Sequence, residues 1–558
     1  MKLFLLLLST FLMLNAALPN DNILKKEIGH MLVVGFEGES LNAESQIVKD
    51  IQEYELGGVI LFDRFYKERS VTKNISSPTQ LQKLTKQLKG FSKKPLFISI
   101  DQEGGRVARL KPSYGFSKIP SAFEASKMSL KKAKEVYKNQ SQMLNEVGIN
   151  TNFAPVVDLN INPKNRVIVG LERSFGSSAD EVAKYAKIVI DAQKGQNIIS
   201  VLKHFPGHGS SLGDSHKGFV DISETWRPKE LEPYKKLIDS NTVDMIMTAH
   251  VFNSYLDAKY PATLSFYVNT KLLREQLGFR GVVISDDMQM KAISKHYSLK
   301  ESVTLAINAG VDILLFGNQL GSQDVGELVE TILEQVKRGA ISYERIRESN
   351  ARIENLHTKN SIIQKPIIFK EKRIAMTKEY IKTHYGLEPK NIKIKPKSIV
   401  LHWTAVMDFE KCFKRLNAEQ LYTDRADIAN ASLLNVSSHF LVKRDGTIYQ
   451  LMPDNWMARH VIGLNYSAIG IENIGGESNE KEDLTPAQVE ANIKLVKYLK
   501  AKYPRINYLL GHHEYREMEK TSLWLERDKG YRTEKADPGK KFMKAVRAEV
   551  KELGLKQP

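Results

Sequence analysis

The sequence predicts an α/β protein with two domains, a (β/α)8 TIM barrel followed by a smaller mixed α/β domain. Three observations predict this. A chain of 558 residues exceeds the size of one ordinary hydrophobic core. Short apolar runs alternate with amphipathic helical stretches over residues 21–358. The pattern then breaks over residues 359–396, and a different alternation fills residues 397–558.

Eight apolar runs predict the strands of the first domain. Because their apolar residues are nearly continuous, each strand is expected to be buried on both faces. The runs are residues 31–36, 57–62, 95–101, 152–158, 200–205, 244–250, 281–287 and 313–317. Helices are predicted over 180–194, closed by Gly195, and over 300–309, closed by Gly310. Eight such units match a (β/α)8 barrel, and a doubly wound open sheet is the alternative.

The segment 359–396 is basic, contains proline and shows no clear period, which indicates a linker with one helix over 377–385. In the second domain, a hairpin is expected around Arg444-Asp445-Gly446. Thr485-Pro486 opens a long helix that ends near Lys502. The expected strands are residues 398–403, 439–443, 447–452, 468–473 and 508–512, and the last helix covers 539–553.

The first 17 residues have the pattern of a signal peptide. Lys2 precedes an apolar run over 3–14, and Ala16 and Ala17 offer small residues for cleavage. The run is too short to span a bilayer core comfortably, and no cysteine follows it for a lipid anchor. We therefore expect a cleaved signal peptide over 1–17, a secreted, periplasmic protein, and no stable membrane insertion after cleavage. The lone Cys412 excludes an internal disulfide.

The composition is that of a soluble globular protein with an excess of positive charge. Hydrophobic residues make up 42% and charged residues 26% of the chain, so large-scale disorder is excluded. The net charge of +17 indicates an anionic partner or surface. No aromatic-interleaved basic motif or zinc-finger spacing supports nucleic acid as that partner. A polyanionic cell wall or membrane surface fits the charge equally well.

Polar residues follow several predicted barrel strands where those strands end. Asp101 ends the third strand, Asp158 the fourth, and Lys203-His204 lies in the fifth. Asp286-Asp287 ends the seventh. Active sites of (β/α)8 barrels lie at the carboxyl ends of the strands, so we expect these side chains to meet at one mouth. One charged strand end is usually a structural ion pair, whereas several at one mouth indicate a catalytic site.

Glycoside hydrolysis needs a carboxylate on one face of the sugar and a proton donor on the other. Asp286 is suited to be the nucleophile, although spacing alone does not separate it from Asp287. His216 is a candidate donor, because Asp214 on the same Gly- and Ser-rich loop can orient its ring and raise its pKa. The alternative for His216 is an exposed loop histidine.

The first domain resembles the family 3 β-N-acetylglucosaminidases of peptidoglycan recycling over about residues 22–355. The resemblance rests on Lys-His-Phe-Pro-Gly-His-Gly at 203–209, Asp214-Ser215-His216, and the segments 101–109, 171–176 and 285–290. It implies retention through a glycosyl-enzyme on Asp286, with His216 as acid/base and Asp214 as its orienter, and no cofactor. It also implies sugar-binding roles for Asp101, Arg109, Arg173, Lys203 and His204.

The implied reaction removes a non-reducing-end GlcNAc from N-acetylmuramic acid in muropeptides. Glucosidases and xylosidases of the same family generally take their acid from a second domain, so the Asp-x-His loop at 214–216 favours a 2-acetamido sugar. Familiar Gram-negative members of this family are cytoplasmic. The signal-like segment 1–17 is therefore a departure, which questions a cytosolic role but not the chemistry.

The second domain contains a set of potential metal ligands: His402, His439, His460, the cluster His512-His513-Glu514, and Asp537. A catalytic zinc needs three N or O ligands and an open position for water. Its bound water becomes hydroxide near neutral pH, and a nearby carboxylate takes the proton. Any one of these histidines alone would more often be an ordinary core or surface residue.

These segments resemble zinc-dependent N-acetylmuramoyl-L-alanine amidases of the peptidoglycan-recognition type over about residues 395–550. The resemblance rests on the segments 399–403, 438–446, 469–472, 511–512 and 535–539 in this order. It implies Zn²⁺ on His402, His512 and Asp537, Glu472 as general base, and Lys535 as the oxyanion-stabilising group. The implied reaction cleaves the bond between the muramic lactyl group and L-Ala.

A long polar insertion, residues 514–534, stands where relatives usually have a short loop. His513 or Glu514 could therefore replace Asp537 as the third ligand. Together the two domains predict a bifunctional hydrolase of peptidoglycan or muropeptides. The alternative is a glucosaminidase whose second domain binds peptidoglycan without cutting it. The sequence does not predict the oligomeric state.

Overall fold

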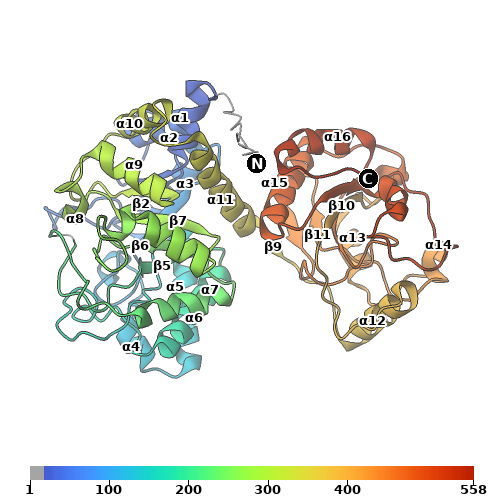
Figure 1. The fold of residues 1–558 in the computed structure, drawn as a ribbon, viewed down its shortest axis with the longest axis horizontal. Helices are drawn as coiled ribbons and strands as arrows, with labels where there is room; N and C mark the ends of the chain where they lie inside the picture. Colours follow the sequence, from blue (N-terminus) through green and yellow to red (C-terminus); the bar gives the residue numbers. More distant parts are fainter. Residues whose placement is uncertain (1–17, 216) are drawn as a thin grey trace, which may run out of the picture. The chain divides into compact units, whose positions relative to one another are not determined.

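A computed structural model describes residues 18–215 and 217–558, which form two compact units (Figure 1). The first unit ends at Ile353 and the second covers Glu354–Pro558. The predicted signal peptide, residues 1–17, and His216 lie outside the described residues. Among the described helices, none has the length and apolar character needed to cross a bilayer.

Eight parallel strands close into a barrel in the first unit, because β1 pairs with both β2 and β8. The strands are β1 Leu32–Gly35, β2 Gly58–Leu61, β3 Phe97–Ile100, β4 Thr151–Asn152, β5 Ile199–Phe205, β6 Met245–Thr248, β7 Val282–Asp287 and β8 Ile313–Phe316. All but the last two residues of β7 are buried, as continuous apolar runs predict. The barrel prediction is confirmed, and the open-sheet alternative is wrong.

The helices of the first unit lie outside its strands (Figure 1). They are α1 Asp21–Gly29, α2 Gln46–Tyr54, α3 Pro78–Phe91, α4 Ala122–Ser126, α5 Leu130–Glu146, α6 Ala179–Lys194, α7 Glu232–Asp239, α8 Lys291–Ser294, α9 Leu299–Ala309 and α10 Val325–Lys337. Helix α11, Tyr343–Ser361, begins in the first unit and ends in the second. The predicted helices 180–194 and 300–309 correspond to α6 and α9. Gly310 ends α9 with a φ of 107°, a conformation that favours glycine.

Strand β4 is much shorter than the predicted run 152–158. Pro155 has no N–H to donate, so it interrupts the ladder after Asn152. An isolated bridge between Val156 and Lys203 resumes the pairing with β5. The chain from Phe153 to Asp158 therefore continues along the barrel, mostly without regular strand pairing, and still delivers Asp158 to the mouth.

The second unit contains a six-stranded mixed sheet in the order β14-β10-β13-β11-β12-β9. Its strands are β9 Ile363–Gln364, β10 Ser398–Trp403, β11 Phe440–Val442, β12 Ile448–Gln450, β13 Ala468–Asn473 and β14 Tyr508–Gly511. Its helices are α12 Glu371–Tyr385, α13 Phe409–Asn417, α14 Ala426–Ala429, α15 Pro486–Lys502 and α16 Lys540–Ala548. The hairpin β11–β12 is antiparallel as predicted, while β10 pairs in parallel with β13 and β14.

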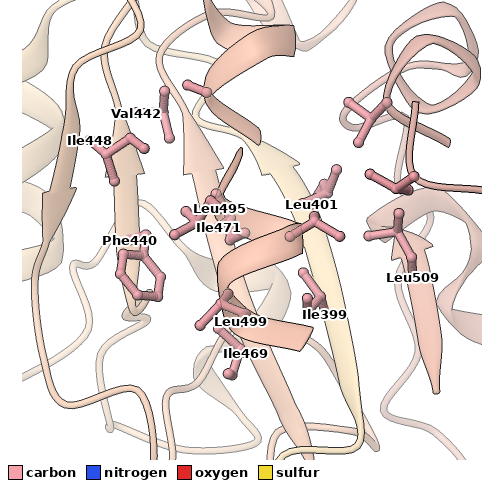
Figure 2. Close-up of a cluster of buried hydrophobic side chains, with 14 of the residues drawn as sticks. Ile399, Leu401, Phe440, Val442, Ile448, Ile469, Ile471, Leu495, Leu499 and Leu509 are labelled. Atoms are coloured by element: carbon pink, nitrogen blue, oxygen red, sulfur yellow. The ribbon is translucent and has the colours of Figure 1, made fainter. Parts of the chain in front are cut away.

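The core of this unit forms between the sheet and α15. Figure 2 shows Leu495 and Leu499 of α15 lying over strands that carry Ile399 and Ile469. All four side chains are fully buried. Burying a side chain of this size stabilises the fold by about 1.5–3 kcal/mol. This packing holds β10 and β13 side by side, which later matters for His402 and Glu472.

The segment 359–396 differs from the predicted linker, because most of it packs into the second unit. Strand β9 pairs with β12, and Ile362 and Ile367 belong to buried clusters. Helix α12 begins at Glu371, six residues before the predicted start, and buries Tyr380. This packing could not be predicted from the sequence, because exposed lysines alternate with single buried apolar residues between 392 and 397. The last helix is also shorter than predicted and ends at Ala548.

Candidate active sites

A cavity of about 940 Å³ opens at the carboxyl end of the barrel strands. The strand-end residues were expected to meet at this position. The cavity is lined by residues at the ends of β3, β5 and β7. The predicted residues that line it are Asp101, Arg109, Arg173, Lys203, His204, Asp214 and Asp286. Because His216 lies outside the described residues, its prediction stays a prediction.

Asp101 lies between two cations at the end of β3. Its Oδ1 accepts a hydrogen bond from Lys203 Nζ at 2.7 Å, and its Oδ2 accepts one from Arg109 Nη2 at 3.3 Å. Burial alone would raise the pKa of Asp101, but Lys203 and Arg109 outweigh it and hold that pKa well below its usual range. Asp101 is therefore an ionised acceptor that can receive hydrogen bonds from sugar hydroxyls.

Glu103 connects the two buried cations of the site. Its carboxylate accepts two hydrogen bonds from Arg173, at 2.8 and 2.7 Å, and contacts Lys203 Nζ at 2.7 Å. Sequence reasoning did not select Glu103 as a site residue. The available signal was a second carboxylate two positions after Asp101, in a segment already singled out for its resemblance. This bidentate geometry fixes the guanidinium plane of Arg173.

Asp158 orients His204. Its Oδ2 lies 2.7 Å from His204 Nδ1, and its Oδ1 accepts the backbone N–H of His208 at 2.8 Å. His204 Nε2 lies 3.2 Å from Arg173 Nη2, which can only donate. We therefore assign the proton of a neutral His204 to Nδ1. Asp158 was noted at the strand end and proves to be a positioning residue.

In the second unit, His402, His512 and Asp537 form a buried group whose ligand atoms lie within 4.8 Å of one another. His402 is the second-to-last residue of β10, and His512 directly follows the neighbouring strand β14. Nδ1 of His402 and Nδ1 of His512 lie 3.2 and 3.0 Å from Asp537 Oδ2. Three atoms that offer lone pairs thus converge on one point.

His460 fixes the tautomer of His402. Its Nε2 lies 3.3 Å from the carbonyl oxygen of Ala468, which can only accept, so Nε2 carries the proton. Its Nδ1 then accepts from His402 Nε2 at 3.0 Å. This leaves His402 Nδ1 without a proton and facing Asp537. Such an arrangement of lone pairs fits a metal ion, which would replace repulsion between acceptors by coordination.

Comparison with known proteins accounts for both sites. Residues 23–356 match the family model described as Glycosyl hydrolase family 3 N terminal domain. The chain belongs to glycosyl hydrolase family 3. Residues 393–540 match the model described as N-acetylmuramoyl-L-alanine amidase. The chain is therefore an enzyme with a family 3 glycoside hydrolase domain and an amidase domain, as the two resemblances predicted.

Curated relatives match the family 3 domain. A Beta-hexosaminidase of Photobacterium profundum is 35% identical over 290 residues, which are 51% of this chain and 80% of that protein. A Beta-hexosaminidase A of Pseudoalteromonas piscicida is 33% identical over 332 residues, 55% of this chain. The chain spans only 54% of the length of that protein.

Two solved structures support the same assignment. A family 3 beta-N-acetylglucosaminidase from Paenibacillus sp. is 25% identical, with a TM-score of 0.55, and the match covers 87% of this chain and 84% of that chain. A Beta-N-acetylhexosaminidase from Beutenbergia cavernae is 26% identical, with a TM-score of 0.53, covering 59% of this chain and 97% of that chain.

Within the family 3 domain, the two carboxylates at the end of β7 differ in their bonding. Asp287 Oδ1 accepts the backbone N–H groups of Gln289 and Gly317, at 3.0 and 3.2 Å. Asp286 Oδ1 accepts the backbone N–H of Asp287 at 2.8 Å. Both line the cavity, but Asp287 connects β7 to the end of β8. This difference favours Asp286 as the carboxylate that faces substrate.

In the amidase domain, Glu472 on β13 is the register partner of His402 on β10. No described residue donates a hydrogen bond to Glu472 Oε2. Burial raises the pKa of Glu472 to about 7, although the charges of His402 and Lys535 oppose that rise. An unpaired carboxylate oxygen beside the metal-type group is the expected position of a general base.

The insertion 514–534 does not displace Asp537. Its start forms a 3-10 helix, and the Tyr515 hydroxyl donates to the carbonyl oxygen of Thr533 at 2.7 Å, which closes the segment on itself. Glu514 is held by Arg547, at 2.9 and 2.6 Å. His513 Nδ1 contacts the backbone oxygen of Asp537 at 3.0 Å. Neither alternative third ligand belongs to the group formed by His402, His512 and Asp537, which favours Asp537 as the third ligand.

His439 is a core histidine. Its Nε2 donates to the carbonyl oxygen of Trp456 at 2.8 Å, and its Nδ1 accepts the backbone N–H of Gly470 at 2.9 Å. Burial lowers the pKa of His439 to about 4. Lys535 and His512 line the same small pocket. The oxyanion-stabilising role of Lys535 stays a prediction.

Proposed function

We propose that the family 3 domain removes non-reducing-end GlcNAc from muropeptides by a retaining mechanism. The observation that carries this is the bonded network of Asp101, Lys203, Arg173 and His204 on the cavity wall, joined by the buried carboxylate of Glu103. Such a fixed set of charged donors and acceptors binds the hydroxyls of one sugar ring in a single orientation. The names of the relatives, hexosaminidases and a β-N-acetylglucosaminidase, support a 2-acetamido sugar.

In this mechanism Asp286 attacks the anomeric carbon and forms a glycosyl-enzyme. His216, oriented by Asp214, gives a proton to the leaving oxygen and then takes one from the attacking water. The lining of the cavity by Asp214 and Asp286 supports these roles. Asp101, Arg109, Arg173, Lys203 and His204 bind the sugar. The reaction needs no cofactor.

We propose that the amidase domain cleaves the bond between the muramic lactyl group and L-Ala. His402, His512 and Asp537 would hold Zn²⁺, which suits two imidazoles and one carboxylate. When bound, zinc supplies a Lewis acid that polarises the carbonyl and lowers the pKa of water. Glu472 takes the proton of the attacking water and passes it to the leaving amine. Lys535 faces the oxyanion that forms on the carbonyl.

We further propose that the protein acts outside the cytoplasm, on peptidoglycan or its muropeptide fragments. The signal-like residues 1–17 and the net charge of +17 support this. Cell fractionation followed by sequencing of the protein's N-terminus in each fraction tests it, because a protein that stays in the cytoplasm and retains residues 1–17 would contradict the proposal.

The decisive experiment uses a GlcNAc–MurNAc-peptide and two single variants that serve as controls for each other. Asp286→Ala is expected to lower GlcNAc release by at least about 10³-fold and to leave peptide release unchanged. His402→Ala is expected to do the reverse. Both products are followed by chromatography in the presence of zinc. If the wild type releases no peptide, the second domain only binds peptidoglycan, which is the alternative function.

A further inference from the structure

The cations that line the family 3 cavity differ in their pairing. In the inner set, Lys203, Arg109, Arg173 and His204 are bonded to Asp101 of the lining or to the buried carboxylates Glu103 and Asp158. Arg64 and Lys217 lie 3.9 Å from Asp63 and 4.0 Å from Asp214, and Asp286 and Asp287 add two more carboxylates to the lining. The outer set consists of Arg69, Arg106, Lys164 and Arg166, which we call the outer rim. All four outer-rim side chains are exposed.

The outer rim has cations without counterions. Among residues 18–215 and 217–558, no carboxylate forms an ion pair with any of the four. Arg106 only donates to the carbonyl oxygen of Gly170, at 3.3 Å. Glu68, next to Arg69 in the chain, is not among the residues that line the cavity. By contrast, Lys217 on the same cavity lies 4.0 Å from Asp214.

The four cations also gather on one side of the mouth. Arg69 follows β2, Arg106 follows β3, and Lys164 and Arg166 follow β4. These strands are neighbours in the barrel, so the loops after them occupy one arc of its carboxyl end. Like charges placed together without partners repel one another, and they create a positive potential that attracts an anion.

We propose that the outer rim is the binding site for a carboxylate on the aglycone, the part of the substrate beyond the cleaved bond. This inference rests on the proposed glucosaminidase function. GlcNAc itself is neutral, and every cation of the inner set is already bonded to a carboxylate. The unpaired positive charge lies on the outer rim, which we assign to the leaving sugar. The free carboxylate of a lactyl ether on that sugar supplies the anion. Where a peptide is attached, the lactyl carboxyl is an amide, and the acidic groups of the peptide supply it instead.

A matched pair of substrates measures the effect of the aglycone carboxylate on cleavage. We compare kcat/KM of the full-length protein for GlcNAc–MurNAc and for its lactyl methyl ester, which differ in one negative charge and one methyl group. The free acid is expected to be preferred about tenfold at low ionic strength. The preference should fall toward unity at about 0.5 M salt, because salt screens exposed charges.

The variant carries Arg69→Gln, Arg106→Gln, Lys164→Gln and Arg166→Gln together. It is expected to lose both the preference and its salt dependence while cleaving the methyl ester like the wild type. A control variant with the same change in net charge carries Lys131→Gln, Lys134→Gln, Lys138→Gln and Lys184→Gln, all exposed on α5 and α6 outside the cavity. The control should keep the preference.

The outcomes separate this inference from the proposed function. Release of GlcNAc from both substrates with equal kcat/KM, or an undiminished preference in the outer-rim variant, would overturn the inference alone. Release from neither substrate would overturn the glucosaminidase proposal and the inference with it.

Discussion

At the scale of single residues, His460 illustrates how a side chain outside the candidate ligand group can determine which atoms that group offers to a metal. The hydrogen bond from His402 Nε2 to His460 Nδ1 keeps the proton on the side of His402 that faces away from Asp537. Without it, His402 could carry its proton on Nδ1 and donate to Asp537 Oδ2 instead. Residues that orient metal ligands in this way are a general feature of zinc sites.

His460→Ala is therefore expected to weaken zinc binding by about 10- to 100-fold, the usual cost of losing an orienting partner. Competition with a chromophoric chelator measures the affinity directly, independently of activity. His460→Gln is the matched variant, because its amide can still accept from His402 and donate to Ala468, and it should recover part of the affinity. Unchanged zinc affinity in His460→Ala, with the fold intact by circular dichroism, would show that His460 does not position the ligand.

Much of both sites followed from the sequence, because strand ends and metal-type residue sets are local patterns. Asp101, Lys203 and Asp286 were placed by the barrel rule alone. Glu103 was not selected as a site residue, and His460 was named only as a potential metal ligand, since the roles of both depend on partners far along the chain. Glu103 meets Arg173 after 70 residues, and His460 meets His402 after 58. No local pattern reports such a pairing.

At the scale of elements, Asp312 anchors helix α11 and the segment before β7 to the start of β8. Its buried carboxylate accepts hydrogen bonds from Arg274 at 2.6 Å, Arg345 at 2.7 Å and Arg352 at 2.9 Å. Burial alone would raise the pKa of Asp312, but the three guanidinium groups outweigh it and hold that pKa well below its usual range. The ionised form is thus stabilised by the fold.

Asp312→Asn is expected to destabilise the family 3 domain by about 3–5 kcal/mol, because it leaves buried guanidinium groups without a counterion. Urea unfolding at pH 7 measures the loss. A depressed carboxyl pKa gives stability that is present above about pH 4 and is lost as pH falls through the folded-state pKa. The difference in free energy of unfolding between wild type and variant should therefore become smaller below pH 4. A gap that does not change with pH would contradict this; exposed Asp239→Asn, on α7, is the control.

The existence or length of some other strands could not be predicted from the sequence, because it depends on backbone pairing. Strand β9 has two exposed residues and no alternation of its own, and it exists only through its pairing with β12. Strand β4 had a long apolar run but was cut short at Pro155. The periodicity of apolar residues predicts an element when the element's own side chains form a buried face. It does not predict an element that is defined only by backbone pairing with another strand.

At the scale of the whole molecule, the two units have separate cores, and a metal would act on only one of them. Among the described residues, the only group of three or more potential ligands is His402, His512 and Asp537, in the amidase domain. A metal that binds the folded state alone stabilises it according to its concentration relative to Kd. We therefore expect no metal-dependent stabilisation of the family 3 domain.

Calorimetry of the full-length protein should therefore show two thermal transitions, of which a chelator lowers one. At a free zinc concentration about 1,000 times Kd, the stabilisation is about 4 kcal/mol, and its loss shifts a transition of a unit of this size by roughly 8–16 °C. The shifted transition belongs to the amidase domain if His402→Ala makes it insensitive to the chelator. Chelation should also abolish peptide release, reversibly with zinc, and leave GlcNAc release unchanged. Two transitions that move together would mean that the units do not unfold independently, and no movement at all would mean that the His402 group holds no metal.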